Sequence, residues 1–224
     1  LTRYVENRND FNDRKGLKLP VPDHRPIYRS ELPDANQAKL DERERFTTAL
    51  GEMVVSCNFI VMDCPGSDNY LSRLAHACAD TLITPINDSL LDIDIIAQLD
   101  TVNREALGPG VYTQMVWEQN NRRTNAGLPP IDWIVTRNRL GAQQMINKKK
   151  MASALEKLSK RIGFRVAPGF SERVIFRELF PRGLTLLDLK DIGVKQLNIS
   201  NVAARQELRD LMSAINLPGV ESRF

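Results

Sequence analysis

The residues with the clearest chemical potential lie between Asn58 and Asn69, where an apolar run leads into an aspartate and a Pro-Gly turn. Residues 58–62 have the pattern of a short strand covered on both faces, because the apolar run is continuous and turn residues follow it. Asp63 would then stand at the carboxyl end of the strand, where open α/β sheets bind their ligands. A carboxylate there suits a hydrated Mg²⁺ ion, which proteins hold with one or two carboxylates beside substrate phosphates.

This pattern is that of the Walker B strand of a P-loop ATPase, but the motif that normally accompanies it is absent. The glycine-rich loop G-x-x-x-x-G-K-S/T occurs nowhere among the 224 residues. The chain begins with leucine rather than methionine. We therefore expect the missing loop to precede Leu1 in the natural protein.

Other kinds of site have little support in the sequence. The chain has three cysteines, two histidines and no C-x-x-C motif, which favours neither a disulfide framework nor a zinc site. Cys64, His76 and Cys78 could be drawn as a metal site, but buried apolar thiols beside a core strand are the simpler interpretation. No apolar run reaches the roughly 18 residues of a membrane span, and no signal peptide is visible, so we expect a cytoplasmic protein with no membrane contact.

Positive charge is concentrated in one part of the chain. Between Arg137 and Arg182 there are twelve Lys or Arg residues and three acidic ones, whereas the net charge of the whole chain is only +3. A surface of this kind can bind DNA, because neutralising phosphates releases counterions. No base-reading motif accompanies the basic residues, so such binding would be independent of sequence. The alternative is an ordinary solvated helix face.

Apolar periodicity and turn residues predict the elements that position these groups. Helices are expected at 2–15, 37–56 with Asp34 as N-cap, 70–79, 143–161 and 202–215, with further helical material over 88–126 that is broken at Gly108-Pro109-Gly110. Strands are expected at 58–62, 81–85 with Pro85 ending the strand, 131–136 and 164–166. Strands that alternate with helices indicate a doubly wound, mostly parallel sheet, here within a single α/β domain over residues 1–224.

Eight segments carry a resemblance to a known family. They are Y-V-E-N-R at 4–8, D-C-P-G at 63–66, T-P-I-N-D-S at 84–89, D-W-I-V-T-R-N-R-L at 132–140, R-I-G-F-R at 161–165, R-V-I-F-R-E-L-F at 173–180, G-L-T-L-L-D-L at 183–189 and A-A-R-Q-E-L-R at 203–209. With these segments the chain resembles the ParA/MinD group of bacterial P-loop ATPases, and most closely the MipZ family of division-plane positioning ATPases. The resemblance implies a P-loop NTPase-like fold that lacks its first strands and P-loop in this chain.

The resemblance also implies ATP and Mg²⁺ as cofactors and gives roles to four residues. The counterpart of Asp63 holds the Mg²⁺-bound water, and Pro65 and Gly66 shape a loop that responds to the γ-phosphate. The family places an asparagine at the position of Asn138 against the adenine edge, which suits an amide that both donates and accepts. The structural alternatives are a helix-capping aspartate, ordinary turn residues and an asparagine that ends a strand.

The expected partners likewise follow from the resemblance. ATP-bound homodimers of the family bind DNA nonspecifically, with the expected contacts here at Lys148, Lys149, Lys150, Arg173 and Arg177. A ParB-like protein and FtsZ are the implied protein partners, and the implied location is the nucleoid. The intact protein would be an ATPase, while residues 1–224 alone would be inactive. The alternatives are a non-catalytic DNA-binding or scaffold module, a plasmid or chromosome partition ATPase, and an ATP-dependent amide-forming ligase.

Overall fold

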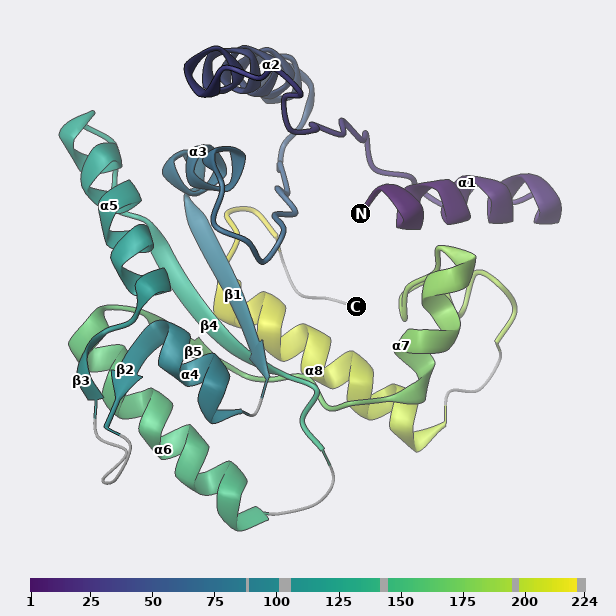
Figure 1. Ribbon diagram of the computed structural model, residues 1–224. Coiled ribbons are helices and arrows are strands. Elements are labelled where there is room, and N and C mark those ends of the chain that lie inside the picture. Colours follow the sequence, from purple (N-terminus) through teal and green to yellow (C-terminus); the bar gives the residue numbers. More distant parts are fainter. Residues whose placement is uncertain (88, 101–105, 142–144, 195–197, 221–224) are drawn as a thin grey trace.

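A three-stranded parallel sheet forms the centre of the computed structural model, which describes residues 1–224 except 88, 101–105, 142–144, 195–197 and 221–224 (Figure 1). The strand order is β1 (Thr81–Asn87), β4 (Asp132–Asn138), β5 (Arg165–Ala167). The other elements are α1 (Thr2–Lys15), α2 (Ala35–Ser56), α3 (Tyr70–Cys78), α4 (Leu90–Ile96), β2 (Ala97–Leu99), β3 (Ala106–Pro109), α5 (Val111–Asn125), α6 (Met145–Ile162), α7 (Val174–Leu179), the 3-10 turn η1 (Phe180–Arg182) and α8 (Ile199–Ile215). The predicted α/β class with a mostly parallel sheet is confirmed.

β4 is buried on both faces, and its alternating side chains show how the helices cover the sheet. Trp133 and Val135 belong to a core with residues of α4, α5 and α6. Ile134 instead packs with Ala167 of β5 and Ile215 of α8. Because successive residues of a strand point to opposite faces, α8 lies on one side of the sheet and α4, α5 and α6 on the other (Figure 1). The sheet is therefore doubly wound, as predicted.

The register of β1 and β4 brings their carboxyl ends side by side. Thr81 pairs with Asp132 at one end, and Asn87 pairs with Asn138 at the other. The prediction that Pro85 ends β1 is wrong, because the strand continues to Asn87. β1 lies at the edge of the sheet, and edge strands tolerate proline since only one side of their backbone enters the hydrogen-bonded ladder.

The predicted strand at residues 58–62 is absent. This segment is irregular, and Phe59 and Val61 are 48% and 78% exposed. A strand forms only when its backbone N–H and C=O groups find a neighbouring strand, and within the described chain β1 pairs with β4 alone. The apolar run therefore predicted a strand for which these residues provide no pairing partner.

The segment 88–126 was predicted as helical with a break at Gly108-Pro109-Gly110, but the strands that lie before and at this break were not predicted. Between α4 and α5 the antiparallel strands β2 and β3 pair, with Ala97 opposite Pro109. Ala97 is fully buried in the main core. The short hairpin therefore closes one end of the helical layer, and no helical periodicity could have revealed it.

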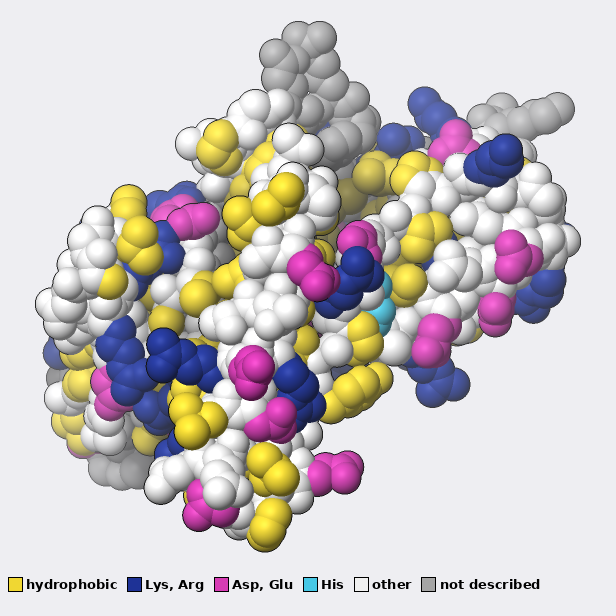
Figure 2. Space-filling model, turned by 90° about the horizontal axis from the view of Figure 1, so that it is seen from above, with side chains coloured by type: hydrophobic (Ala, Val, Ile, Leu, Met, Phe, Trp, Pro, Cys, Tyr) yellow, Lys and Arg dark blue, Asp and Glu magenta, His cyan; other side chains and the backbone are white. Residues whose placement is uncertain are grey.

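Helix α2 is confirmed together with its N-cap, because the Asp34 carboxylate accepts two backbone N–H groups of the first turn. Its predicted apolar face is only partly covered, since Phe46 is buried while Leu40 and Val54 are 65% and 63% exposed. α2 packs on α3 rather than on the sheet (Figure 1). Hydrophobic side chains lie exposed between charged ones on the face shown in Figure 2. None of the described helices, α2 included, combines the length and apolar character that a membrane span requires.

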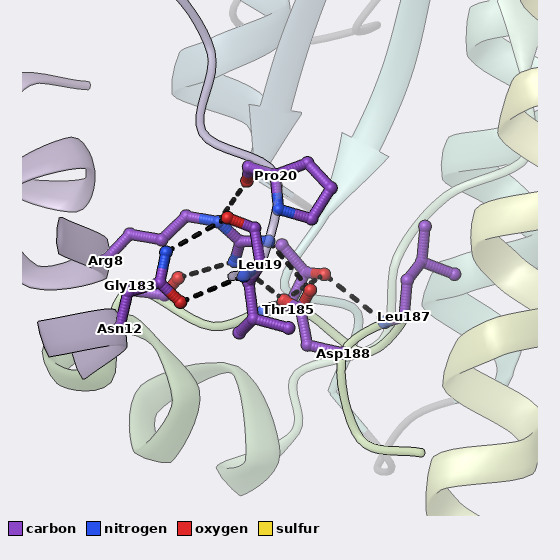
Figure 3. A network of polar contacts seen from close by, with 8 residues as sticks. All are labelled: Arg8, Asn12, Leu19, Pro20, Gly183, Thr185, Leu187 and Asp188. Atoms are coloured by element: carbon purple, nitrogen blue, oxygen red, sulfur yellow. Dashed lines mark hydrogen bonds and ion pairs between the residues drawn. The ribbon is translucent and has the colours of Figure 1, made fainter. Parts of the chain in front are cut away.

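A buried ion pair joins α1 to the segment that follows η1 (Figure 3). Arg8 donates to both carboxylate oxygens of Asp188 at 2.8 Å, and also to the carbonyl oxygens of Pro20 at 2.6 Å and Gly183 at 2.8 Å. Asp188 also accepts from the backbone N–H and the hydroxyl of Thr185. Gly183 has a φ of +61°, and a Cβ there would lie 2.1 Å from the backbone nitrogen of Arg8. The close approach of the two segments therefore requires a glycine.

An apolar cluster surrounds this ion pair and is distinct from the sheet core. Its buried members are Phe11, Leu19, Leu179, Leu184, Leu186, Leu189 and Ala204. They come from α1, α7, α8 and the segments next to them, so burial of these side chains holds the first helix against the last third of the chain. The ion pair fixes the orientation of this contact, because two guanidinium nitrogens of Arg8 bind the two carboxylate oxygens of Asp188.

Breaking the Arg8–Asp188 pair is expected to destabilise the fold strongly. The Asp188→Ala variant leaves Arg8 buried without its counter-charge, a situation that costs about 3–5 kcal/mol in the free energy of unfolding. Denaturation in urea measures this loss. The matched control is Asp23→Ala, which removes an ion pair to Arg25 whose side chains are 41% and 47% exposed, and should cost at most about 1 kcal/mol. Equal small losses in both variants would contradict the assignment.

A chain of hydrogen bonds runs from His76 into the core and defines the tautomer of its ring. Nδ1 lies 2.6 Å from the Ser72 carbonyl oxygen, so Nδ1 donates and Nε2 accepts. The Tyr112 hydroxyl donates to Nε2 at 3.0 Å, the Thr84 hydroxyl donates to the Tyr112 oxygen at 3.1 Å, and the Trp133 indole N–H donates to the Thr84 oxygen at 3.0 Å. Burial lowers the pKa of His76 below its ordinary value of 6.5, although the bond to Ser72 works in the other direction.

Stability is expected to decrease as the pH falls, through this buried imidazole. Below pH 6.5 the unfolded chain binds a proton that folded His76 resists, so the free energy of unfolding decreases as the pH drops from 6.5 toward the lower folded pKa. Each unit of pKa difference contributes about 1.4 kcal/mol. The slope between pH 7 and pH 5 should be smaller in His76→Gln than in the wild-type protein. His24→Gln, which removes the other histidine, is the control, and identical slopes for wild type and His76→Gln would refute the expectation.

Candidate functional site

Residues 137–140 and residues 169–172 continue the pairing of β4 with β5 beyond the ends of these strands. The Phe170 nitrogen donates to the Arg137 oxygen at 2.9 Å, the Leu140 nitrogen to the Phe170 oxygen at 2.9 Å, and the Glu172 nitrogen to the Leu140 oxygen at 3.1 Å. Gly169 makes this approach possible, because a Cβ there would lie 2.6 Å from the Arg137 oxygen. The two segments lie at the carboxyl end of β4, where open α/β sheets bind ligands.

A pocket of about 530 Å³ lies between these segments and α7. This volume is within the range of about 300–1,000 Å³ of small-molecule sites. The rings of Phe170 and Phe176 are 6.2 Å apart in an edge-to-face arrangement, so the pocket combines aromatic surface with a few polar groups. Its lining residues are Asn138, Arg139, Phe170, Ser171, Glu172, Arg173, Phe176, Arg177 and Phe180.

Asn138, the predicted adenine contact, lines this pocket at the end of β4. Its side-chain oxygen accepts the Arg139 backbone N–H at 2.9 Å, and within the described residues no contact uses its amide nitrogen. Arg139 has a φ of +52°, a left-handed conformation that is uncommon for any residue other than glycine. Such conformations cluster at binding and switch sites. Sequence analysis included Arg139 in the basic segment but did not assign it to a site.

The pocket also brings together Arg173 and Arg177, which were both predicted to contact DNA, but their surroundings differ. Arg173 pairs with Glu207 of α8 at 2.7 Å, and the two side chains are only 17% and 19% exposed. Arg177 is exposed and has no acidic partner in the part of the chain that the structure describes. Arg177 is therefore a cation at the pocket with no acidic partner among the described residues, whereas the charge of Arg173 is neutralised inside the protein.

Glu207 is a pocket-supporting residue that sequence reasoning missed. Its carboxylate accepts the hydroxyl of Ser171 at 2.7 Å and the backbone N–H of Ser171 at 3.2 Å, in addition to the bonds from Arg173. Burial alone would raise the pKa of Glu207, but the hydrogen bonds from Arg173 and Ser171 outweigh it and leave the pKa below its ordinary value. The carboxylate therefore stays charged. On helical periodicity alone it was an ordinary partly exposed helix residue.

Asp63, Pro65 and Gly66 lie outside this pocket, in the irregular segment between α2 and α3. The Asp63 carboxylate is 61% exposed and lies 2.9 Å from the Leu1 nitrogen. Pro65 and Gly66 are exposed, and a Cβ at Gly66 would meet no atom within 4 Å. An accessible carboxylate on a loosely packed loop fits the needs of a hydrated Mg²⁺ ion, which takes most of its ligands from water and phosphates.

No group of three or more His, Cys, Asp or Glu side chains among the described residues could hold a metal ion by itself. Cys64, His76 and Cys78 therefore form no metal centre, and His76 is engaged in the core hydrogen-bond chain instead. Burial raises the pKa of the half-buried Cys64 thiol. That thiol accordingly favours its neutral, unreactive form.

The basic helix predicted at 143–161 is confirmed as α6 (Met145–Ile162). Lys148, Lys149 and Lys150 lie in its first turns, and their side chains lie outside the described residues. Because α6 covers one face of the sheet, the side of the helix that turns away from Leu155 and Leu158 faces solvent. The helix can therefore present charge while it packs on the core.

A larger cavity of about 860 Å³ lies at the other end of the sheet, where the strands begin. Its charged lining groups are already engaged, since Arg165 binds both oxygens of Asp132 at 2.8 and 2.5 Å and Arg123 pairs with Asp80. None of the predicted site residues lines it. The pocket beside Asn138 is therefore the better candidate for ligand binding.

Comparison with known proteins identifies the family of this chain. A family model described as ATPase MipZ matches residues 1–219. No curated protein matches the chain closely. The family consists of ParA-like ATPases that regulate the division site, so nucleotide use and a general relation to the division machinery come with it. Since the match spans nearly the whole sequence, the chain belongs to the MipZ ATPase family.

Proposed function

We propose that this protein is a nucleotide-switched regulator of division-site placement. ATP with Mg²⁺ would drive homodimerisation, the dimer would hold chromosomal DNA without sequence preference, and hydrolysis would reset the cycle. A ParB-like protein would direct the dimer, and FtsZ would be the target whose assembly it restrains. Membership of the MipZ family supports the general role, and the pocket beside Asn138 is the observation that supports nucleotide binding.

The chemistry of the pocket suits a purine base. Phe170 and Phe176 provide aromatic surface for a flat ring, and the Asn138 amide can donate to and accept from the adenine edge at the same time. The pocket lies at the carboxyl end of β4, the usual position of ligands in such sheets. Arg139 adds positive charge at its lining, which favours an anionic nucleotide over a neutral base.

The phosphate end would involve Asp63 and the loop that carries Pro65 and Gly66. Bound Mg²⁺ would bridge the phosphates and neutralise their charge. Asp63 would hold a water of that ion, which its exposed carboxylate permits. The loop has room for a ligand beside Gly66, so it could order around the γ-phosphate as switch segments do.

DNA contact would come from Lys148, Lys149 and Lys150 on α6 together with Arg177 and Arg173. Arg177 is ready for a phosphate because it is exposed and unpaired among the described residues. Arg173 would have to share its guanidinium with Glu207. Binding through phosphates alone requires no base-reading geometry, which agrees with the lack of a sequence-reading motif and with a nucleoid-associated protein.

Magnesium-dependent ATP binding is the first test of this proposal. Calorimetry should detect MgATP binding by the protein together with any residues that naturally precede Leu1, with dimers seen by sedimentation. The Asp63→Asn variant should lose most of the gain in affinity that Mg²⁺ provides, roughly tenfold for the loss of one charged acceptor of a hydrogen bond from the Mg²⁺-bound water. Asp68→Asn in the same loop, whose carboxylate already pairs with Arg73, is the control. Absence of ATP binding in the natural protein, with DNA binding retained, would favour a non-catalytic DNA-binding module.

DNA affinity should depend on salt through the basic residues. In the ATP-bound protein, Arg177→Ala should weaken binding to any duplex and lower the slope of log K against log salt concentration by about 1. Replacement of Lys148, Lys149 and Lys150 together should lower the slope by about 3, because each lysine that neutralises a phosphate adds about one unit to it. Arg29→Ala removes an exposed arginine outside the basic segment and should leave the slope unchanged. A slope that is the same in all variants would disprove this DNA surface.

A further inference from the structure

We propose that Glu207 of α8 is a positioning residue for the nucleobase pocket and contributes to its preference for a base over a free phosphate chain. The proposal rests on the proposed function, since it names a residue that shapes the same site. Glu207 would act through Ser171 and Arg173, which line the pocket, and would not itself touch the ligand. Its carboxylate would fix both the shape and the charge of one wall.

The backbone hydrogen bonds of that wall leave one N–H group for Glu207. In the segment 170–172 the N–H groups of Phe170 and Glu172 donate to the parallel segment, to the oxygens of Arg137 and Leu140. The N–H of Ser171 points the other way and has no place in this pairing. Glu207 accepts it at 3.2 Å and accepts the Ser171 hydroxyl at 2.7 Å. The carboxylate therefore completes the hydrogen bonding of the wall from its outer side.

The Arg173 side chain points toward α8. Its Nη2 and Nε donate to the two carboxylate oxygens of Glu207 at 2.7 and 3.3 Å, and its Nη1 donates to the Ser200 hydroxyl at 3.1 Å. All three contacts lead to the start and middle of α8. The guanidinium is thus held against the helix, and its charge is compensated where it borders the pocket. This wall consequently favours an uncharged ring, while Arg139 remains for anionic groups.

Helix α8, which carries Glu207, is held firmly in place. α8 is anchored in two cores, by Ala204 in the cluster with α1 and by Ile215 in the cluster on the sheet face of Ile134. Glu207 lies between these two anchors. A carboxylate on a helix fixed at both ends can hold a loop to within the tolerance that binding requires, which a residue within the loop could not do.

The test compares ATP with inorganic tripolyphosphate, which lacks the base and ribose. In the natural-length protein with Mg²⁺, E207Q should bind ATP at least tenfold more weakly than wild type, because a charged acceptor of four hydrogen bonds becomes a neutral one. Tripolyphosphate should bind E207Q as tightly as wild type or more tightly, since Arg173 is released. This second ligand also reports whether the variant is folded. E178Q, which neutralises an exposed carboxylate of α7 that does not line the pocket, is the matched control and should leave both affinities unchanged.

The remaining outcomes separate this inference from the proposed function. An equal loss for both ligands, or no loss for ATP, would overturn the positioning role of Glu207 while ATP binding by the wild-type protein kept the proposed function in place. The same loss in E178Q as in E207Q would overturn it too, because a general charge effect would then suffice. Failure of the wild-type protein to bind ATP would overturn the proposed function and this inference with it.

Discussion

The parallel pairing of β4 with its neighbours is the interaction on which the rest of this structure depends. β4 is buried on both faces, so its backbone groups can be satisfied only by the strands beside it. Pairing with β1 aligns Asn87 with Asn138, and pairing with β5 continues past the strand ends through the Phe170 and Leu140 contacts. The pocket exists because this ladder holds two chain segments parallel at the carboxyl edge of the sheet.

Two ion pairs then join distant parts of the chain to that framework. Arg8–Asp188 holds α1 beside the segment after η1, and Arg173–Glu207 holds the pocket wall against α8. Apolar burial stabilises both contacts but has no direction, whereas a bidentate guanidinium–carboxylate pair specifies orientation as well as distance. The Arg173–Glu207 pair lies at the pocket itself, since Arg173 is one of the lining residues, and α7 supplies Phe176 and Arg177 to the same lining. The C-terminal helices are therefore part of the site and not a separate appendage.

Local sequence patterns predicted helices well, whereas they did not predict which segments pair as strands. Helices such as α1 and α2 were predicted to within about two residues, because caps and periodicity lie in adjacent sequence. The prediction of a strand at 58–62 was wrong, because an apolar run does not show whether a neighbouring strand is available for pairing. The β2–β3 hairpin was missed for the related reason that its antiparallel contact joins residues that are not adjacent in the sequence. The prediction that Pro85 ends its strand was wrong for a similar reason. Whether a proline interrupts a strand depends on whether the strand lies at the edge of the sheet.

The sequence by itself determined the α/β class, the family and the presence of Asn138, Asp63 and the basic segment, because composition, local periodicity and motif order are properties of the chain alone. Only the tertiary structure decided which of these residues meet. It brought Asn138, Arg173 and Arg177 to one pocket, left Asp63 outside that pocket, and introduced Glu207 from a helix 34 residues after Arg173. The physical reason is that hydrogen-bond partners and burial are set by packing between distant segments. No local pattern encodes the identity of a partner so far along the chain.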